Sequence, residues 1–222
     1  MRKGALLPAA LAAVLLAGCG PEVRTTYYAD GQTWSEIRYR DGLPDGLWTT
    51  FWPNGGLKSE ARYEEGVPHG EWRTWFENET PQTEQAYLDG RPEGRWRHWY
   101  DNGRLLSEGV YVRGAKDGQW REWYGDGTLK AEAHFAEGDE TGSATVYGTN
   151  GKPKNRIDYK DGIPVFQVFW WESGIKLAEG PVKDDKRNGD WTVWNPDGTL
   201  NEEHTGTYVN DQLVSDSEPE GS

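Results

Sequence analysis

The feature that most limits how this chain can fold is a repeat of 24 residues. Its first column is glycine, at Gly46, Gly70, Gly94, Gly118 and Gly142. Its second column is tryptophan, two residues further on, at Trp48, Trp72, Trp96 and Trp120. Repeats of this length bury their apolar side chains against the neighbouring repeat, so the spacing predicts an array of similar units in which these residues have a structural role.

Three more columns keep the same register. The first is aromatic, at Tyr39, Tyr63, Tyr87, Tyr111, Phe135 and Tyr159. The second is also aromatic, at Phe51, Trp75, Trp99 and Trp123. The third is acidic, at Glu60, Glu84, Glu108 and Glu132. The pattern weakens later in the chain, where Ala144 and Val168 occupy the tryptophan column and one residue is lost near position 170.

Each repeat carries two turn signals, such as Asp41-Gly42 and Asn54-Gly55, of the kind that hairpin turns with positive φ require. Two turns in each repeat predict two strands in each repeat. Residues 57–64 alternate between small or aromatic and charged side chains, which is typical of a strand with one apolar face. In the following strand, Trp72 and Trp75 fall on opposite faces, so both faces of the sheet carry aromatic columns.

We therefore expect an all-β fold, an elongated single-sheet β-meander of 24-residue hairpin repeats that covers residues 28–210. The composition agrees with this expectation. The 29 Gly and 12 Pro suit a chain with many turns. The 13 Trp and 11 Tyr supply the apolar surface that a chain with few aliphatic residues needs in order to fold. The polar residues 211–222 are predicted to form a disordered acidic tail.

The first residues are typical of a targeting signal. Residues 1–18 form a signal peptide, with two basic residues before an apolar stretch that is too short to span a membrane. The tetrapeptide Leu16-Ala17-Gly18-Cys19 resembles the lipobox of bacterial lipoproteins, in which the cysteine becomes the acylated first residue of the mature chain. The resemblance assigns Cys19 a lipid such as palmitate, and makes residues 19–27 a lipidated tether.

The same resemblance implies a location in the cell envelope. Gly20, and not the aspartate typical of inner-membrane retention, follows the cysteine, which favours the outer membrane over the inner one. Several acyl chains on one residue are enough for stable anchoring. The alternative is an ordinary secretory signal with an incidental cysteine.

The repeat itself resembles a known family. The unit G-x-W-x-x-W-Y-x-(D/N)-G-x-L-x-x-E-x-x-Y-x-x-G, as in 118–138 with Phe135 in the tyrosine place, resembles the bacterial variant of the MORN repeat. The resemblance covers about residues 28–210. It implies a repeat scaffold that contacts proteins and, in some members, lipids. Bacterial chains with this variant are often labelled antitoxins of toxin-antitoxin systems.

No residue pattern in the chain indicates catalysis, a metal or a cofactor. The four histidines show no ligand spacing, and nucleophile and phosphate-binding motifs are absent. We therefore expect no catalytic residue, no metal site and no cofactor. Because the acidic column repeats in every unit, we interpret it as structural, whereas a glycosidase needs one unique carboxylate pair. Asp139 with Glu140, or Asp184 with Asp185, would supply such a pair in the irregular repeats.

The column Phe51, Trp75, Trp99 and Trp123 is the candidate binding surface. Aligned aromatic rings flanked by Arg and Glu suit a sugar ring or a peptide, and packing between repeats is the competing interpretation. The net charge of −13 argues against nucleic acid and against anionic lipid as partners of the sheet itself.

These observations favour a non-enzymatic, lipid-anchored envelope protein that presents a β-surface to a protein or glycan partner and meets the membrane only through its N-terminal lipid. Two alternatives remain: a carbohydrate-binding or glycan-processing protein that uses the tryptophan column, and an immunity-type partner that binds a secreted toxin through its acidic surface. The oligomeric state is unknown from sequence.

Overall fold

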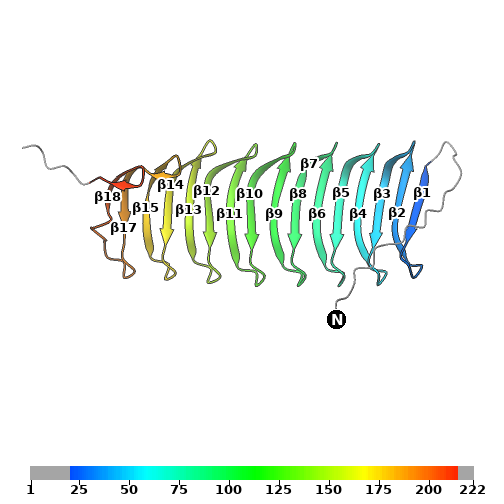
Figure 1. Cartoon of the computed structure of the whole chain (residues 1–222), viewed down its shortest axis with the longest axis horizontal. Coiled ribbons are helices and arrows are strands. Elements are labelled where there is room, and N and C mark those ends of the chain that lie inside the picture. The colour runs from blue at the N-terminus through cyan, green and yellow to red at the C-terminus, as the bar shows by residue number, and fades with distance from the viewer. Residues whose placement is uncertain (1–20, 215–222) are drawn as a thin grey trace, which may run out of the picture. The chain divides into compact units, whose positions relative to one another are not determined.

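The computed structural model describes residues 21–214, and all regular secondary structure in that range is β-strand (Figure 1). The chain divides into two compact units, Met1–Ala115 and Lys116–Ser222. The predicted signal peptide, Cys19 and residues 215–222 lie outside the described residues. The all-β prediction is confirmed, and so is the prediction of antiparallel hairpins in a meander.

Unit 1 holds the first nine strands. They are β1 (Glu22–Tyr27), β2 (Thr33–Arg40), β3 (Leu43–Phe51), β4 (Leu57–Glu64), β5 (Val67–Trp75), β6 (Pro81–Leu88), β7 (Arg91–Pro92), β8 (Gly94–Trp99) and β9 (Leu105–Val112). Each strand from β1 to β6 pairs antiparallel with the next along the chain, β6 also pairs directly with β8, and β8 pairs with β9. Strand β1 lies within the segment that we assigned to the tether, so the sheet begins before residue 28.

Unit 2 continues in the same way. Its strands are β10 (Ala115–Trp123), β11 (Leu129–Ala136), β12 (Asp139–Tyr147), β13 (Pro153–Lys160), β14 (Ile163–Trp170), β15 (Lys176–Lys183), β16 (Lys186–Arg187), β17 (Gly189–Val193), β18 (Gly206–Val209) and β19 (Gln212–Leu213). Consecutive strands from β10 to β15 pair antiparallel, and β17, β18 and β19 complete the order after β15.

The two turns of each repeat have different geometry. At Asp41-Gly42 and Asp89-Gly90 both residues have positive φ, between 50° and 81°, which is the two-residue type I′ turn that fits the twist of a hairpin. At the other turn only the glycine has positive φ, as at Gly55. There the amide of Gly55 donates to the carbonyl of Trp52, and the Asn54 side chain accepts from the amide of Gly56, so the second turn is a longer loop.

The Gly-x-Trp motif has a specific geometric origin. Gly70 lies directly opposite Tyr87 on the neighbouring strand and has a φ of 87°, which an L side chain rarely adopts. Trp72, two residues on, therefore shares a face with Tyr87, and their ring centroids are 4.8 Å apart. The same Gly–aromatic pairing recurs at Gly46, Gly94, Gly118 and Gly142.

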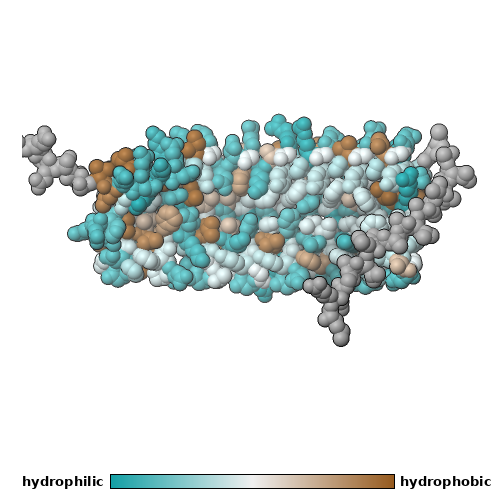
Figure 2. Space-filling model, in the orientation of Figure 1, coloured by the Kyte–Doolittle hydropathy of each residue, from teal (hydrophilic) through white to brown (hydrophobic). Residues whose placement is uncertain are grey.

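Full burial is rare in this fold. The side chains of Ile37 and Ala61 in unit 1, and of Val168, Val182, Trp191 and Tyr208 in unit 2, are the most buried hydrophobic ones among residues 21–214. In unit 2, Val182, Trp191 and Tyr208 form one cluster, against which Phe169 and Ala178 pack. Elsewhere the aromatic columns provide the packing. In the view of Figure 2, hydrophobic residues are scattered among hydrophilic ones.

The position of the lost residue differs from the sequence interpretation. In regular repeats the tryptophan pairs with a residue such as Ala61, opposite Trp72. In the irregular hairpin Ile157 pairs with Gln167, and Tyr159 with Pro164. Gln167, and not Val168, therefore occupies the tryptophan column, because the residue is lost between Pro164 and Gln167. Val168 points to the opposite face, where it is only 1% exposed.

Candidate binding face

Strand alternation gives the sheet of unit 1 two faces of different character. The ladder face carries Trp48, Tyr63, Trp72, Tyr87, Trp96 and Tyr111. The charged face carries Glu60, Arg73, Glu84, Arg97 and Glu108, which pair across consecutive strands. The structural glycines and tryptophans of the sequence analysis belong to the ladder face, and the candidate binding column belongs to the charged face.

On the ladder face the rings pack in sequence from strand to strand. Successive centroids lie 4.7–5.9 Å apart with tilted planes, a favourable geometry for aromatic pairs. The indole N–H of Trp72 donates to the carbonyl of Arg62 at 3.0 Å, and that of Trp96 to the carbonyl of Ala86 at 3.2 Å. Burial raises the pKa of the phenols of Tyr63 and Tyr87. This column is the packing core of unit 1.

A histidine lies in the same layer. His98 Nε2 is 3.2 Å from the side-chain amide nitrogen of Gln85, and Nδ1 is 3.4 Å from the Ser107 hydroxyl. Burial lowers the pKa of His98, which keeps the ring neutral at physiological pH. These contacts give His98 a packing role on the ladder face.

On the charged face, glutamate and arginine alternate across the strands. Arg97 Nη1 lies 3.3 Å from Glu84 Oε2, and Arg97 Nε lies 3.9 Å from Glu108 Oε2. Arg73 pairs instead with Glu71 on its own strand, at 2.7 Å. All these side chains are partly exposed, so each pair contributes at most about 1 kcal/mol to stability. Two members of the acidic column, Glu84 and Glu108, therefore pair with the same arginine.

The candidate binding column lies at the strand ends of this charged face. Phe51, Trp75 and Trp99 are the last residues of β3, β5 and β8, and all three are half-buried. Across the strand pair they face Leu57, Pro81 and Leu105. Within the described part of unit 1 they stack on no other ring, in contrast to the ladder face.

The fourth member of the column, Trp123, belongs to unit 2, where it is the last residue of β10 and pairs with Leu129. Tyr147 holds the next position of the column in unit 2, and its hydroxyl donates to Glu132 Oε1 at 2.7 Å. This contact places the column and the acidic residues on one face in unit 2 as well.

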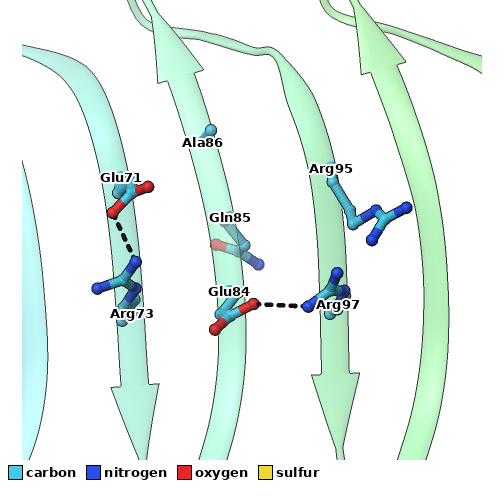
Figure 3. A pocket seen from close by; sticks show the side chains of 7 residues that line it. All are labelled: Glu71, Arg73, Glu84, Gln85, Ala86, Arg95 and Arg97. Carbon is cyan, nitrogen blue, oxygen red and sulfur yellow. Dashed lines mark hydrogen bonds and ion pairs between the residues drawn. The ribbon is translucent and has the colours of Figure 1, made fainter.

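Between the paired charges of unit 1 the surface has a depression of about 270 Å³ (Figure 3). It is lined by Glu71, Arg73, Glu84, Gln85, Ala86, Arg95 and Arg97. Figure 3 shows Glu71 joined to Arg73 and Glu84 joined to Arg97, whereas Arg95 is exposed and has no ion-pair partner among residues 21–214. The depression can hold a carboxylate or a hydrogen-bonding group of a partner against Arg95.

Sequence reasoning noted arginines beside the aromatic column but did not identify them as a repeated column of their own. Arg73, Arg97 and Arg121 recur at the 24-residue interval, each two residues before a column tryptophan, so the signal was present in the repeat. An Arg-x-Trp segment in a strand places both side chains on one face.

The carboxylates of the glycosidase alternative lie at hairpin turns. Asp184 and Asp185 are the two central residues of the turn between β15 and β16, with φ of 52° and 59°, and both are exposed. Asp139 is exposed at the start of β12, and Glu140 accepts a hydrogen bond from the Tyr159 hydroxyl. Glu140 lines a surface depression of about 260 Å³ and Asp185 another of about 460 Å³, whereas Asp139 and Asp184 line neither of these two.

Residues 21–214 contain no group of three or more His, Cys, Asp or Glu side chains placed to hold a metal ion. The same range contains no helix with the length and apolarity to cross a membrane.

Comparison with known proteins gives three results. Crystal structures of TcdB2-TccC3 and of TcdB2-TccC3-Cdc42 align with 80% of this chain at 11% identity, with TM-scores of 0.19, and the chain spans 14% and 13% of those chains. No curated protein matches the chain. The model of the MORN repeat variant matches residues 44–65, 92–113 and 116–137. These three segments, two in unit 1 and one in unit 2, are therefore MORN-variant repeats, and the hairpins described above are their structure.

Proposed function

We propose that this protein is a non-enzymatic scaffold, anchored in the bacterial envelope by a lipid on Cys19, that binds a protein partner through the charged face of unit 1. The MORN-variant repeats support the scaffold role. The lipobox at 16–19 supports the anchor and the outer-membrane location.

One observation carries the choice of face. The ladder-face rings pack on one another, whereas Trp75 and Trp99 stack on no ring within the described part of unit 1 and are only partly buried beside Arg73 and Arg97. Tryptophan and arginine are the residues most enriched at the energetic centres of protein interfaces. Arg95 adds an unpaired guanidinium to the same surface.

A glycan partner is the second candidate. Partly exposed tryptophan rings with guanidinium groups two residues away also suit a sugar ring that carries hydroxyl or carboxylate groups. The same surface would then bind saccharides, with Trp75 and Trp99 as the stacking residues.

The test is capture of partners from detergent-solubilised envelopes on immobilised protein, with a Trp75→Ala/Trp99→Ala variant and a Trp72→Ala control. The proposal expects a partner that the wild type retains and the folded double variant loses. Retention by the double variant would remove the charged face from the interaction. Elution of the partner by free oligosaccharide would favour the glycan alternative.

A further inference from the structure

The ladder face of unit 2 contains a gap where one repeat departs from the others. Ala144 occupies the tryptophan column, which holds Trp120 in the preceding repeat. The structure has a depression of about 260 Å³ at this place. Trp120, Ala131, Ala133, Phe135, Ala144 and Val146 line it. We name this depression the Ala144 slot.

The regular repeats show what such a position normally holds. Trp72 lies between the rings of Tyr63 and Tyr87, with centroid distances of 5.3 and 4.8 Å. The corresponding flanking residues of the slot are Phe135 and Tyr159, three repeats further on. The slot therefore has the position that an indole ring takes in a regular repeat. Phe135 and Tyr159 stand where Tyr63 and Tyr87 flank Trp72.

Two other departures from the repeat border the same slot. The position two residues before the first glycine of the motif is proline in three repeats of unit 1, and it is Lys116 and Glu140 in unit 2. Both of these residues line the slot. The Lys116 ammonium lies 4.5 Å from the ring centroid of Trp120 and 4.7 Å from that of Phe135, so aromatic faces already hold this cation.

The charge around the other side of the slot is negative. Burial, the hydrogen bond to Glu140 and the charges of Glu140 and Asp185 raise the pKa of Tyr159 to about 12. The Arg121 side chain points to the opposite face, with Trp123, where it donates to Gln119 at 2.6 Å. Glu140 has no cationic partner among residues 21–214, and the whole chain has a net charge of −13. A ligand that complements Glu140 therefore carries a positive charge.

We propose that the Ala144 slot binds an aromatic side chain, flanked by basic residues, of a partner protein. The ring fills the place of the missing indole beside Phe135, and a basic group of the same segment pairs with Glu140. Tryptophan fits best, because the indoles of the regular repeats donate to the carbonyl ten residues earlier, and the corresponding carbonyl here is that of His134. The slot lies on the opposite face from Trp123, so this inference does not depend on the charged face.

The test uses fluorescein-labelled peptides and anisotropy with the purified protein. The first peptide is Gly-Arg-Trp-Arg-Gly with blocked termini. The second replaces its tryptophan by alanine, and the third replaces both arginines by glutamate. We expect the first peptide to bind at least about tenfold more tightly than either of the others. We also expect its affinity to fall as salt is raised, since the charged group of the slot is accessible to solvent.

Two variants locate the binding site. Ala144→Trp restores the repeat and fills the slot with the protein's own ring, so it should lose the first peptide while its melting temperature stays equal or rises. Glu140→Gln should weaken binding, whereas Glu36→Gln, which changes the net charge equally in unit 1, should leave binding unchanged. Should Ala144→Trp fail to fold, Ala144→Leu gives the same loss by occupying the slot with a smaller side chain.

Three results would contradict the proposal. Equal affinity for the tryptophan and alanine peptides, or undiminished binding by folded Ala144→Trp or Ala144→Leu, would overturn the proposal. So would absence of binding by the wild type. A Trp75→Ala/Trp99→Ala variant should bind the peptide normally, which separates this result from the test of the charged face.

Discussion

The indole N–H of Trp52 donates a hydrogen bond to the main-chain carbonyl of Trp75, 3.1 Å away and one repeat further on. The same bond runs from Tyr28 to Phe51 at 2.7 Å and from Tyr124 to Tyr147 at 2.8 Å. At the equivalent place in the third repeat stands Phe76, which has no donor. Side chains of one repeat thus bond to the main chain of the candidate binding column in the next repeat.

This relationship gives a prediction with a natural control. Trp52→Phe should lower the free energy of unfolding by about 1 kcal/mol through the lost hydrogen bond. Phe76→Trp should raise it by about 0.5–1 kcal/mol, because a donor is restored toward the carbonyl of Trp99. Urea denaturation of both variants measures the changes, and equal destabilisation by the two would contradict the role of the hydrogen bond.

The two aromatic columns should differ sharply in their effect on stability. Trp72→Ala removes a ring that packs on two others, so we expect a loss of about 3 kcal/mol. Trp75→Ala removes a half-buried ring that stacks on no other within unit 1, so we expect about 1 kcal/mol. Thermal and urea unfolding decide the order. A larger loss for Trp75→Ala would assign the packing core to the wrong face.

Acid should destabilise unit 1 through His98. Its pKa in the folded protein is lowered by burial, so folding favours the neutral ring. The stabilisation is complete above the ordinary pKa of 6.5 and is lost as the pH falls below it. The His98→Gln variant should therefore lose less stability than the wild type between pH 7.5 and about pH 5. Urea unfolding at both values measures the difference, and parallel losses would exclude His98 as the cause.

Alkaline titration should single out Tyr159. Because its pKa is raised to about 12, folding favours the neutral phenol, and the stabilisation is complete below pH 10 and lost as the pH rises to about 12. Absorbance at about 295 nm follows tyrosinate formation. Tyr159→Phe should remove the latest step, and Glu140→Gln should move that step to lower pH. A titration unchanged by Glu140→Gln would contradict the contact between the two side chains.

The proposed lipid anchor has a direct test. The wild-type protein should fractionate with membranes, and Cys19→Ser should appear in the soluble fraction because it offers no thiol for acylation. Mass spectrometry of the N-terminal peptide should show acyl mass on residue 19. Membrane association of Cys19→Ser would place the anchor elsewhere.

Much of the fold follows from the sequence because each strand repeats the same pattern. The glycine, tryptophan and tyrosine columns recur at one interval, and two turn dipeptides in each repeat are enough to predict hairpins. Burial within the array is set by neighbours of the same kind, so the fold needs no long-range information. For this reason the β-meander was predictable although its aliphatic content is low.

The assignment of columns to faces needed the strand register. Trp72 and Tyr87 are 15 residues apart, and only the pairing of Gly70 with Tyr87 shows that their rings meet. The pairing of Glu84 with Arg97 is equally invisible without that register. A single lost residue also moves the tryptophan column from Val168 to Gln167, because a shift of one residue reverses the face of every side chain.

That one-residue slip also bears on how the gene can change in length. Among the regular repeats, gain or loss of 24 codons by unequal recombination keeps each side chain on its own face. The same event across the slip between Pro164 and Gln167 would join strands out of phase. Gain or loss of a whole repeat is therefore compatible with the register of the early repeats, whereas a recombination that spans the slip would reverse the faces of the strands that carry Trp191 and Tyr208.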